Sequence, residues 1–291
     1  MKNVIITGAD GFIGSYVTET FARRGVNVLA LDLPGKPAKL HESELVTYRS
    51  CDVFAAGQTI DMAGRTEYDT FISLAWRGLD GPQKEDPGVQ AKNMKGVAAS
   101  LSAAARLGCR RFVDLGSITE LFSQPDTAYS AAKKDGADLC RKLSVELGVE
   151  YIRPLLTNAY GPGAEKGFVD SVLKKILRSE PLLFTSAVQL YDFVYVADVA
   201  EALFLIAEKG RPSSRYVIGS GKAAPLRSFI NRLLHACGSS CVPAFGALTY
   251  RGDMLPESAF DISPLREECG FLPAVPFEEG IRKTYEYMTL K

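Results

Sequence analysis

The sequence predicts an α/β fold, with a doubly wound parallel sheet and a smaller, mixed carboxyl-terminal lobe. Short β-branched runs alternate with longer helical stretches from the first residues onward. Gly25, Gly108 and Gly148 lie where a predicted helix must turn into a predicted strand. This alternation is typical of parallel strands that are covered by helices on both faces.

The amino-terminal part contains the regular alternation. The predicted strands cover residues 4–6, 26–31, 70–75, 111–115 and 149–153. The predicted helices cover residues 12–24, 88–107 and 129–147. Because helices between successive strands make those strands parallel, we expect residues 1–165 to form one Rossmann-like domain.

The carboxyl-terminal part follows a looser pattern that is punctuated by proline and glycine. Asp198-Val199-Ala200-Glu201 matches a capping box that opens a helix. Two amphipathic helices are predicted over residues 226–236 and 277–288. We expect residues 166–291 to form mainly a substrate-binding lobe, with residues 190–218 returning to the sheet domain.

The composition is that of a globular chain with balanced charge. The 291 residues are 46% apolar and include 34 basic and 34 acidic side chains, which argues against a nucleic-acid binder with a basic face. Because the first apolar run is short and no run of 18 apolar residues follows, we expect neither a signal peptide nor a membrane span. The six cysteines lack C-x-x-C spacing and the two histidines lack ligand partners, so we expect no metal site. A cytoplasmic protein with reduced thiols is the simplest interpretation.

The strongest local motif lies between the first predicted strand and the first predicted helix. It reads Thr7-Gly8-Ala9-Asp10-Gly11-Phe12-Ile13-Gly14. Glycines at this turn allow a tight bend, close approach of a pyrophosphate and close helix–strand packing, although glycines alone also fit a purely structural turn. Its place between strand and helix predicts an NAD(P) site that includes Gly8, Gly11, Phe12, Ile13 and Gly14.

Asp32 ends the second predicted strand. A carboxylate at that position can accept hydrogen bonds from an adenosine ribose. It also repels a 2′-phosphate, so Asp32 favours NAD over NADP as the cofactor. Lys36 and Lys39 lie nearby and leave NADP possible.

A second motif, Tyr129-Ser130-Ala131-Ala132-Lys133, lies at the start of a predicted helix. Residues i and i+4 share one helix face, so the Lys133 ammonium can lie near the Tyr129 phenol. A nearby cation favours the phenolate and brings the phenol toward proton transfer at neutral pH. Ser117 and Thr119 add hydroxyl groups just beyond a predicted strand, at the edge where open parallel sheets bind ligands.

These motifs and several later segments resemble the extended short-chain dehydrogenase/reductase family, in particular its nucleotide-sugar epimerases, reductases and dehydratases. The similarity runs over nearly the whole chain. The further matching segments are Cys51-Asp52-Val53, Ser73-Leu74-Ala75-Trp76, Thr157-Asn158-Ala159-Tyr160-Gly161-Pro162-Gly163, Tyr191-Asp192-Phe193-Val194-Tyr195-Val196 and Arg251-Gly252-Asp253. Together the motifs are specific for the superfamily and much less specific for one reaction.

The resemblance implies a redox mechanism. Tyr129 would move a proton at a sugar hydroxyl or keto oxygen, while hydride passes between the sugar carbon and a nicotinamide. Lys133 would hold the nicotinamide ribose and lower the pKa of Tyr129. Ser117 would hydrogen-bond the reacting oxygen, with Thr119 as the reserve candidate.

The resemblance also implies the binding residues. Asp52 and Val53 would contact the adenine, and Leu74 and Ala75 would lie beside the cofactor together with Lys133. The expected substrate contacts are Trp76, for which simple packing is the alternative, Asn158, Tyr191 and Arg251.

Three departures from the family pattern bear on the reaction. Ile118-Thr119 follow Ser117 where the family's 4,6-dehydratases have Asp-Glu, so dehydration lacks its acid and base. Tyr191 replaces an arginine that usually grips the substrate diphosphate, which leaves Arg251 for that role or indicates a different substrate head. The stretch from Ser117 to Tyr129 is also short.

We therefore predict an NAD(P)-dependent nucleotide-sugar epimerase, with NAD favoured and NADP possible, that works at C4 through a transient 4-keto sugar. The first alternative is an NAD(P)H-dependent 4-keto nucleotide-sugar reductase. The second alternative, which the sequence supports less, is a non-catalytic dinucleotide-binding sensor. The expected partner is a nucleotide-diphosphate sugar, without nucleic acid or membrane. By resemblance, the helix over 88–107 and the Tyr129 helix would form the interface of a homodimer.

Overall fold

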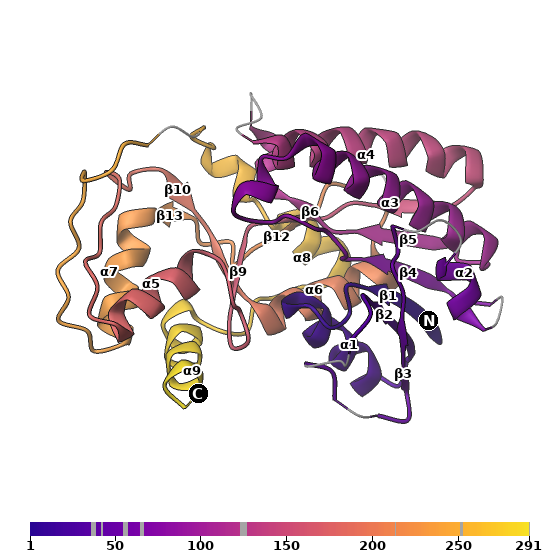
Figure 1. The fold of residues 1–291 in the computed structure, drawn as a ribbon, viewed down its shortest axis with the longest axis horizontal. Helices are drawn as coiled ribbons and strands as arrows, with labels where there is room; N and C mark the ends of the chain where they lie inside the picture. The colour runs from indigo at the N-terminus through magenta and orange to yellow at the C-terminus, as the bar shows by residue number, and fades with distance from the viewer. Residues whose placement is uncertain are drawn as a thin grey trace.

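A six-stranded parallel sheet forms the centre of the molecule, in the order β3-β2-β1-β4-β5-β7 (Figure 1). In that order its strands are Val46–Ser50, Asn27–Asp32, Asn3–Thr7, Thr70–Ser73, Arg111–Asp114 and Glu150–Ile152. The chain leaves β1 toward β2 on one side and β4 lies on the other, which opens a crevice at the carboxyl ends of these strands. The computed structural model describes residues 1–35, 39–41, 43–54, 58–64, 67–122, 127–212, 214–250 and 253–290.

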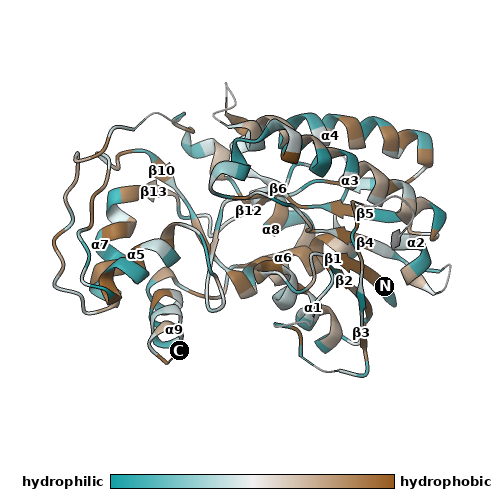
Figure 2. Cartoon of the chain, in the orientation of Figure 1, coloured by the Kyte–Doolittle hydropathy of each residue, from teal (hydrophilic) through white to brown (hydrophobic). Residues whose placement is uncertain are grey.

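Helices cover both faces of this sheet (Figure 1). One face carries α1 (Phe12–Arg23) and α6 (Val196–Lys209), which pack against each other, and the other carries α3 (Pro87–Arg106) and α4 (Ala128–Leu147). Alternate residues of β1 enter two separate cores, because successive side chains of a strand point to opposite faces. Val4 and Ile6 pack in the α1–α6 core, whereas Ile5 packs in the core that includes α3. The predicted doubly wound α/β fold is therefore confirmed, and Figure 2 shows its central strands as hydrophobic.

The predicted helices of the sheet domain agree with the structure to within one residue at each end. Gly25, Gly108 and Gly148 all have positive φ, as expected where a helix turns into a strand. The elements that were not predicted from the sequence include β3 and α2 (Gln58–Ala63). β3 is an edge strand whose side chains are largely exposed, so it lacks the apolar pattern that reveals the other strands.

The predicted capping box at Asp198-Val199-Ala200-Glu201 is wrong. α6 begins earlier, at Val196, and its N-cap residue makes no side-chain cap bond. The Asp198 carboxylate instead accepts hydrogen bonds from the backbone N–H groups of Ala274 and Val275, at 3.0 and 3.1 Å. Asp198 therefore anchors a distant loop, a role that the local sequence pattern does not reveal.

The carboxyl-terminal lobe packs around an aromatic core. Its helices are α5 (Phe168–Leu177), α7 (Leu226–Ala236) and α9 (Phe277–Thr289). The rings of Phe193, Phe229 and Phe277 lie with their centroids 4.9 to 5.6 Å apart, in tilted and edge-on contacts that aromatic pairs prefer. The two amphipathic helices predicted for this part are α7 and α9, and both bury one face in this core.

Short strands connect the lobe with the sheet domain. β8 (Leu155–Leu156) lies between β6 (Gly116–Ser117) and β12 (Val217–Ile218), and β9 (Asn158–Tyr160) pairs with β11 (Phe193–Tyr195). The remaining elements are β10 (Leu190–Tyr191), β13 (Ala224–Pro225), α8 (Ser263–Cys269) and the 3-10 helices η1 (Pro82–Lys84), η2 (Ile118–Leu121) and η3 (Glu257–Phe260). The domain boundary near residue 165 stays a prediction. Among the described helices, none is long and apolar enough to span a bilayer.

Candidate active site

A cavity of about 270 Å³ lies at the carboxyl ends of β1, β2 and β4. Its walls include most of the residues predicted for the cofactor, namely Gly8, Gly11, Phe12, Ile13, Gly14, Asp32, Val53, Leu74 and Ala75. Trp76, Arg77 and Leu115 also line it. The sequence motifs for the cofactor therefore converge on one crevice, although they are spread along the chain from Gly8 to Trp76.

The glycine turn fits a pyrophosphate because side chains there would fill the space. A Cβ at Gly14 would lie 1.9 Å from the carbonyl oxygen of Gly8, and a Cβ at Gly8 would lie 2.9 Å from the backbone nitrogen of Ala75. Gly8 also has φ +68°, which favours glycine. Gly11 caps α1 without a side chain, and the first turn of α1 contains no acidic residue. The positive end of the α1 dipole is thus left for an anion such as a dinucleotide pyrophosphate.

Asp32 is held in place at the wall of the cavity. Its carboxylate accepts hydrogen bonds from the backbone N–H groups of Asp10 and Leu33, at 2.8 and 2.7 Å. The Lys39 ammonium pairs with Glu165 at 3.0 Å instead of with Asp32, and Lys36 lies outside the described residues. The carboxylate retains lone pairs that can accept from a ribose, which fits NAD.

Asp52 does not line the cavity directly, whereas its partner Arg77 does. The Asp52 carboxylate accepts from the Arg77 guanidinium at 2.9 Å and from the backbone N–H of Phe54 at 3.1 Å. The Arg77 guanidinium lies 4.6 Å from the centroid of the Phe54 ring. The contact of Asp52 with an adenine stays a prediction. Arg77 and Phe54 were not among the predicted site residues, although both directly follow predicted segments.

Tyr129 and Ser117 form the centre of the predicted catalytic group. The Thr127 side chain caps α4 by accepting from the Ser130 N–H at 3.0 Å, which places Tyr129 in the first turn of the helix. The Ser117 hydroxyl lies close enough to the Tyr129 phenol to lower its pKa as a hydrogen-bond donor. The Ser117 and Thr119 hydroxyl groups share a hydrogen bond, at 2.9 Å. Thr119 is therefore attached to Ser117 and one step removed from Tyr129.

Lys133 and Trp76 lie beside this pair. The Lys133 ammonium donates to the carbonyl oxygen of Leu115 at 2.8 Å and lies 3.9 Å from the centroid of the Trp76 ring. The Trp76 and Tyr129 rings meet edge to face, with centroids 5.9 Å apart. The indole N–H of Trp76 donates to Gln90 at 2.9 Å, which fixes the ring between the cofactor cavity and the catalytic group. Trp76 thus contacts both Tyr129 and Lys133 as well as packing.

Burial dominates the acid–base properties of Tyr129 and Lys133, the two side chains predicted to be catalytic. It raises the pKa of Tyr129 to about 12, opposed by the hydrogen bond from Ser117, and lowers the pKa of Lys133 to about 8. Arg153 is a cation that lowers the pKa of Tyr129 in this structure, whereas the Lys133 ammonium lies 6.0 Å from the centroid of the Tyr129 ring and its effect on that pKa stays a prediction. Arg153 follows β7 and was not among the predicted site residues.

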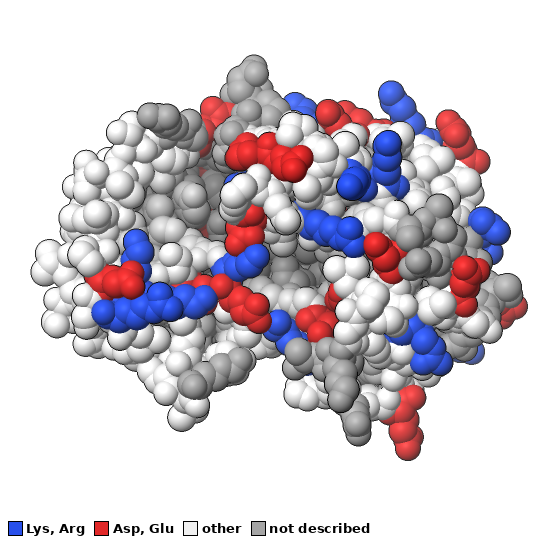
Figure 3. Space-filling view, in the orientation of Figure 1, with Lys and Arg blue, Asp and Glu red and all other residues white. Residues whose placement is uncertain are grey.

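The predicted substrate residues Asn158 and Tyr191 lie on strands that connect with the carboxyl-terminal lobe. The Asn158 amide donates to the backbone carbonyl of Asp192 at 3.0 Å. Tyr191 stacks on Phe193, with centroids 5.8 Å apart, and so belongs partly to the aromatic core of the lobe. Arg251 lies outside the described residues. Figure 3 shows a hollow between the two lobes on this face, with acidic and basic side chains at its rim.

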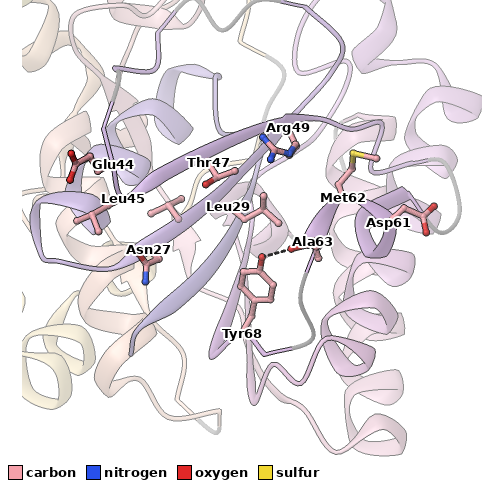
Figure 4. A pocket seen from close by; sticks show the side chains of 12 residues that line it. Asn27, Leu29, Glu44, Leu45, Thr47, Arg49, Asp61, Met62, Ala63 and Tyr68 are labelled. Carbon is pink, nitrogen blue, oxygen red and sulfur yellow. Dashed lines mark hydrogen bonds between the residues drawn. The ribbon is translucent and has the colours of Figure 1, made fainter.

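A larger hollow of about 440 Å³ lies away from the catalytic group (Figure 4). Its walls come from β2, β3 and α2, and inside it the Tyr68 hydroxyl donates to the carbonyl oxygen of Ala63 at 2.7 Å. None of the predicted site residues lines it. Its size therefore does not mark it as the site of chemistry.

The fold and this crevice define a Rossmann-type enzyme that uses a nicotinamide dinucleotide. Residues 4–219 match the model of the NAD dependent epimerase/dehydratase family, and the chain belongs to that family. Its cofactor is accordingly NAD, and Gly8, Gly11, Gly14 and Asp32 are the residues that fit it.

Relatives of this chain carry names of three different reactions. The dTDP-glucose 4,6-dehydratase of Xanthomonas campestris pv. campestris is 24% identical over 326 residues, with 99% of this chain and 93% of the relative covered. The dTDP-4-dehydro-6-deoxyglucose reductase of Escherichia coli is 23% identical over 319 residues, with 100% and 98% covered. The crystal structure of UDP-glucose 4-epimerase from Thermotoga maritima with UDP-glucose superposes with a TM-score of 0.86 at 22% identity, with 99% and 100% covered. The choice among such reactions depends on the residues of the site.

Proposed function

We propose that this chain is an NAD-dependent nucleotide-sugar 4-epimerase. The observation that carries the proposal is the cluster of Tyr129, Ser117 and Lys133 around Trp76, whose ring lines the cofactor cavity. Ile118 is buried where a dehydratase would need an acid, and Thr119 follows it. Glu120 is a nearby carboxylate, but both of its oxygens accept from Arg153. Proton transfer at a sugar oxygen is thus favoured over elimination of water.

The proposed reaction begins with a proton transfer by this chain. Tyr129 acts as the phenolate and takes the proton of the C4 hydroxyl group, while Ser117 hydrogen-bonds the same oxygen and holds it against the Tyr129 oxygen. Bound NAD supplies the hydride acceptor and later the hydride donor. After the 4-keto sugar turns its other face toward the nicotinamide, Tyr129 returns the proton to the oxygen. Both protonation states of Tyr129 are used once in each cycle, so the enzyme regains its starting state.

Lys133 and Trp76 form the wall between the sugar and the nucleotide. The Lys133 ammonium lies against the Trp76 ring and bonds to the Leu115 carbonyl. We infer that Lys133 donates to the nicotinamide ribose when NAD is bound. Trp76, fixed by Gln90, would then exclude water from the reacting carbon.

The alternative is reduction of a 4-keto nucleotide sugar with exchange of NAD(P)H. The chain spans 98% of the E. coli reductase, and Tyr191 stands where the family usually has a diphosphate-binding arginine. A short chain that lacks this arginine resembles the smaller keto-sugar reductases of the family. A pure sensor is less well supported, because Tyr129, Lys133 and Ser117 are all in bonding positions.

Cofactor retention separates the two enzymes. An epimerase restores NAD in every cycle and has no need to release it, whereas a reductase must exchange its cofactor in every turnover. The test is to measure nucleotide absorbance of freshly purified, dialysed protein and then to assay nucleotide hexoses without added cofactor. Retained NAD with interconversion of a hexose pair supports the epimerase. Empty protein that consumes NAD(P)H with a 4-keto nucleotide sugar would establish the reductase instead.

The proposed partner is a nucleotide-diphosphate sugar, bound in the hollow between the lobes. Asn158 and Trp76 are the described residues that we assign to the sugar. We also propose a homodimer formed by the outer faces of α3 and α4, where Leu139 and Val145 are exposed by 43% and 80%. The family resemblance and these exposed apolar side chains support that interface.

A further inference from the structure

Three charged side chains lie buried directly behind the catalytic group, and the reaction described above does not use them. They are Asp114, Glu120 and Arg153, and their side chains are 2%, 7% and 7% exposed. Charges so far from water are costly unless they are paired and fully hydrogen-bonded. We call these three residues the Arg153 triad.

Arg153 pairs with both carboxylates of the triad. Its Nε and Nη2 atoms donate to the two oxygens of Glu120, at 2.9 and 2.8 Å, in a bidentate arrangement. Its Nη1 atom donates to Asp114, which also accepts from the Tyr151 hydroxyl at 2.9 Å. Arg153 is thus paired on both sides, and removing either carboxylate leaves a buried cation short of a partner.

The remaining contacts of the triad end on catalytic residues. The Ser117 backbone N–H donates to Glu120 Oε1 at 2.8 Å, and Arg153 Nη2 donates to the backbone carbonyl of Lys133 at 3.0 Å. The Glu120–Arg153 ion pair therefore connects the end of β6 with the first turns of α4. This connection fixes the two segments that carry Ser117 and Lys133.

Because Gly116 has no side chain, it leaves room for the side chains of Glu120 and Arg153. A Cβ at this position would lie 2.8 Å from Glu120 Oε1 and 3.1 Å from Arg153 Nε. The glycine directly before Ser117 therefore permits the close approach of a carboxylate and a guanidinium to the catalytic backbone.

Charge balance links the triad to the catalytic side chains. The two carboxylates and Arg153 sum to one negative charge, which the protonated Lys133 neutralises. Glu120 and Asp114 raise the pKa of Lys133 and Arg153 lowers it, while Glu120 raises the pKa of Tyr129 and Arg153 lowers it. The groups that face Tyr129 and Lys133 from the surrounding elements are Asp114, Glu120, Arg153, the ring of Trp76, and Lys84 with its ammonium 5.7 Å from the centroid of the Tyr129 ring.

We propose that Glu120 and Arg153, with Asp114, are positioning residues that hold Ser117 and Lys133 and supply the electrostatic field in which Tyr129 transfers its proton and Lys133 keeps its charge. The inference rests on the proposed roles of Tyr129 and Lys133. It adds side chains that act on the reaction through other residues and touch neither sugar nor cofactor.

Trp76 makes this proposal testable without a substrate. It is the chain's one tryptophan, it lies 3.9 Å from the Lys133 ammonium and it meets the Tyr129 ring edge-on. A change of charge on either neighbour alters indole emission. We expect the emission of Trp76 to titrate with a midpoint near the Lys133 pKa of about 8, and we expect Lys133→Met to abolish that transition.

Glu120→Gln keeps the size of the side chain and removes its charge. Because Glu120 raises the pKa of both Tyr129 and Lys133, its loss moves the titration midpoint of Trp76 emission to lower pH, by about one pH unit. The acid limb of the pH–rate profile for sugar turnover moves in the same direction. Wild-type protein that shows no Trp76 transition, or a Lys133→Met variant that retains it, would refute the premise.

Glu150→Gln is the matched control. Glu150 accepts from the same two nitrogens of an arginine, Arg111 Nε at 3.0 Å and Nη2 at 2.8 Å, at the amino-terminal ends of β5 and β7, away from the Arg153 triad. Both variants lose an arginine–carboxylate pair and both are expected to unfold at a lower temperature. Only Glu120→Gln shifts the Trp76 midpoint, since Glu150 does not face the catalytic group.

An unchanged Trp76 midpoint in folded Glu120→Gln would overturn the proposal and leave the triad a structural ion pair. If circular dichroism shows that Glu120→Gln is unfolded, the same titration of Asp114→Asn decides, because Asp114 also raises the Lys133 pKa. The emission measurement is independent of the proposed function. If Glu120→Gln shifts the Trp76 midpoint but the wild-type protein turns over no nucleotide sugar, the epimerase proposal is rejected and the role of the Arg153 triad stands. If the wild-type protein turns over a nucleotide sugar but Glu120→Gln leaves the Trp76 midpoint unchanged, the epimerase proposal stands and the role of the triad is rejected.

Discussion

Tyr129 carries the proton in the proposed reaction, so a change of one oxygen atom tests its role. Tyr129→Phe keeps the ring against Trp76 and removes the hydroxyl next to Ser117. We expect nearly unchanged folding and NAD binding, with turnover reduced by roughly 10² or more. Ser117→Ala is expected to show a smaller loss of turnover.

Tyr68→Phe is the control for Tyr129→Phe. It removes a buried hydroxyl that donates to Ala63 in the other cavity (Figure 4), which costs about 1 kcal/mol of stability and no turnover. Near-wild-type turnover in Tyr129→Phe would remove Tyr129 from the mechanism. A larger loss in Thr119→Ala than in Ser117→Ala would instead assign the reacting oxygen to Thr119.

Asp32 decides between the two dinucleotides. Its fixed carboxylate is placed to accept from an unphosphorylated ribose and to repel a 2′-phosphate, so NAD(H) should bind more tightly than NADP(H). Asp32→Ala should weaken the binding of NAD(H) by about tenfold or more and reduce the preference for NAD(H) over NADP(H). Calorimetric titration of both nucleotides checks this. Equal affinities in the wild-type protein would show that a cation near the ribose outweighs Asp32.

Individual residues of the site differ in how well the sequence predicts them. The glycine turn, Asp32, Tyr129 and Lys133 follow local motifs whose chemistry depends on neighbours in the chain. Arg153 and Glu120 carry no such motif, since their pairing exists only after β7 and η2 are brought together. Arg77 is similar, because its carboxylate partner lies in another segment.

The tight packing of the turn between β1 and α1 can be tested by a substitution at Gly14. A Cβ at Gly14 would lie 1.9 Å from the Gly8 carbonyl oxygen and 2.8 Å from Ala9 Cα, and backbone atoms cannot move aside easily. We expect Gly14→Ala to lower the free energy of unfolding by about 1–3 kcal/mol or more and to weaken NAD binding. Urea denaturation measures the first effect and nucleotide titration the second.

Gly136→Ala on α4 is the matched control for Gly14→Ala. Its Cβ would lie 3.5 Å from Met94 Cγ, which is an ordinary contact, so the substitution should be neutral or stabilise the helix by up to about 1 kcal/mol. Equal stabilities of the two variants would show that the turn is not as tightly packed as the structure indicates.

A substitution on the outer face of α4 tests the proposed dimer interface of α3 and α4. Leu139 is an exposed leucine on α4, and Leu248 is a similarly exposed leucine in the carboxyl-terminal lobe, at 43% and 51%. We expect Leu139→Arg to convert a dimer into monomers because it buries a charge in an apolar contact, whereas Leu248→Arg should leave the dimer intact. Light scattering after size-exclusion chromatography gives the mass. A wild-type monomer, or a dimer that survives Leu139→Arg, would place the interface elsewhere or remove it.

At the level of elements, long helices are predictable and irregular segments are not. α1, α3 and α4 combine apolar periodicity with glycine stops, and their bounds are correct to one residue. Edge strand β3 exposes most of its side chains and gives no pattern. The Asp198 capping box fails because the sequence motif is local, whereas the partners of Asp198 are near residue 274.

The whole molecule buries many phenol and thiol groups that ionise less readily in the folded chain than in the unfolded chain. Burial is the first cause of a raised pKa for six tyrosines, at positions 16, 129, 151, 160, 195 and 216. It is also the first cause for five cysteines, at positions 51, 109, 140, 237 and 269. Lys133 has a pKa that burial lowers instead, to about 8.

These shifts predict how stability depends on pH. A tyrosine or cysteine with a raised pKa contributes its full stability below the pKa of the unfolded chain, about 8.5 for cysteine and 10 for tyrosine, and loses it as pH rises toward the folded value. Lys133 acts in the opposite sense between about pH 8 and 10.5, but as one group against eleven it is outweighed. We expect the unfolding temperature to fall from about pH 9 and steeply above about pH 10. Thermal scans across this range, with tyrosinate absorbance recorded in parallel, check the prediction. An unfolding temperature that stays level to about pH 11, or tyrosinate that forms in the native protein near pH 10, would show that these phenols and thiols are more open to water than their packing indicates.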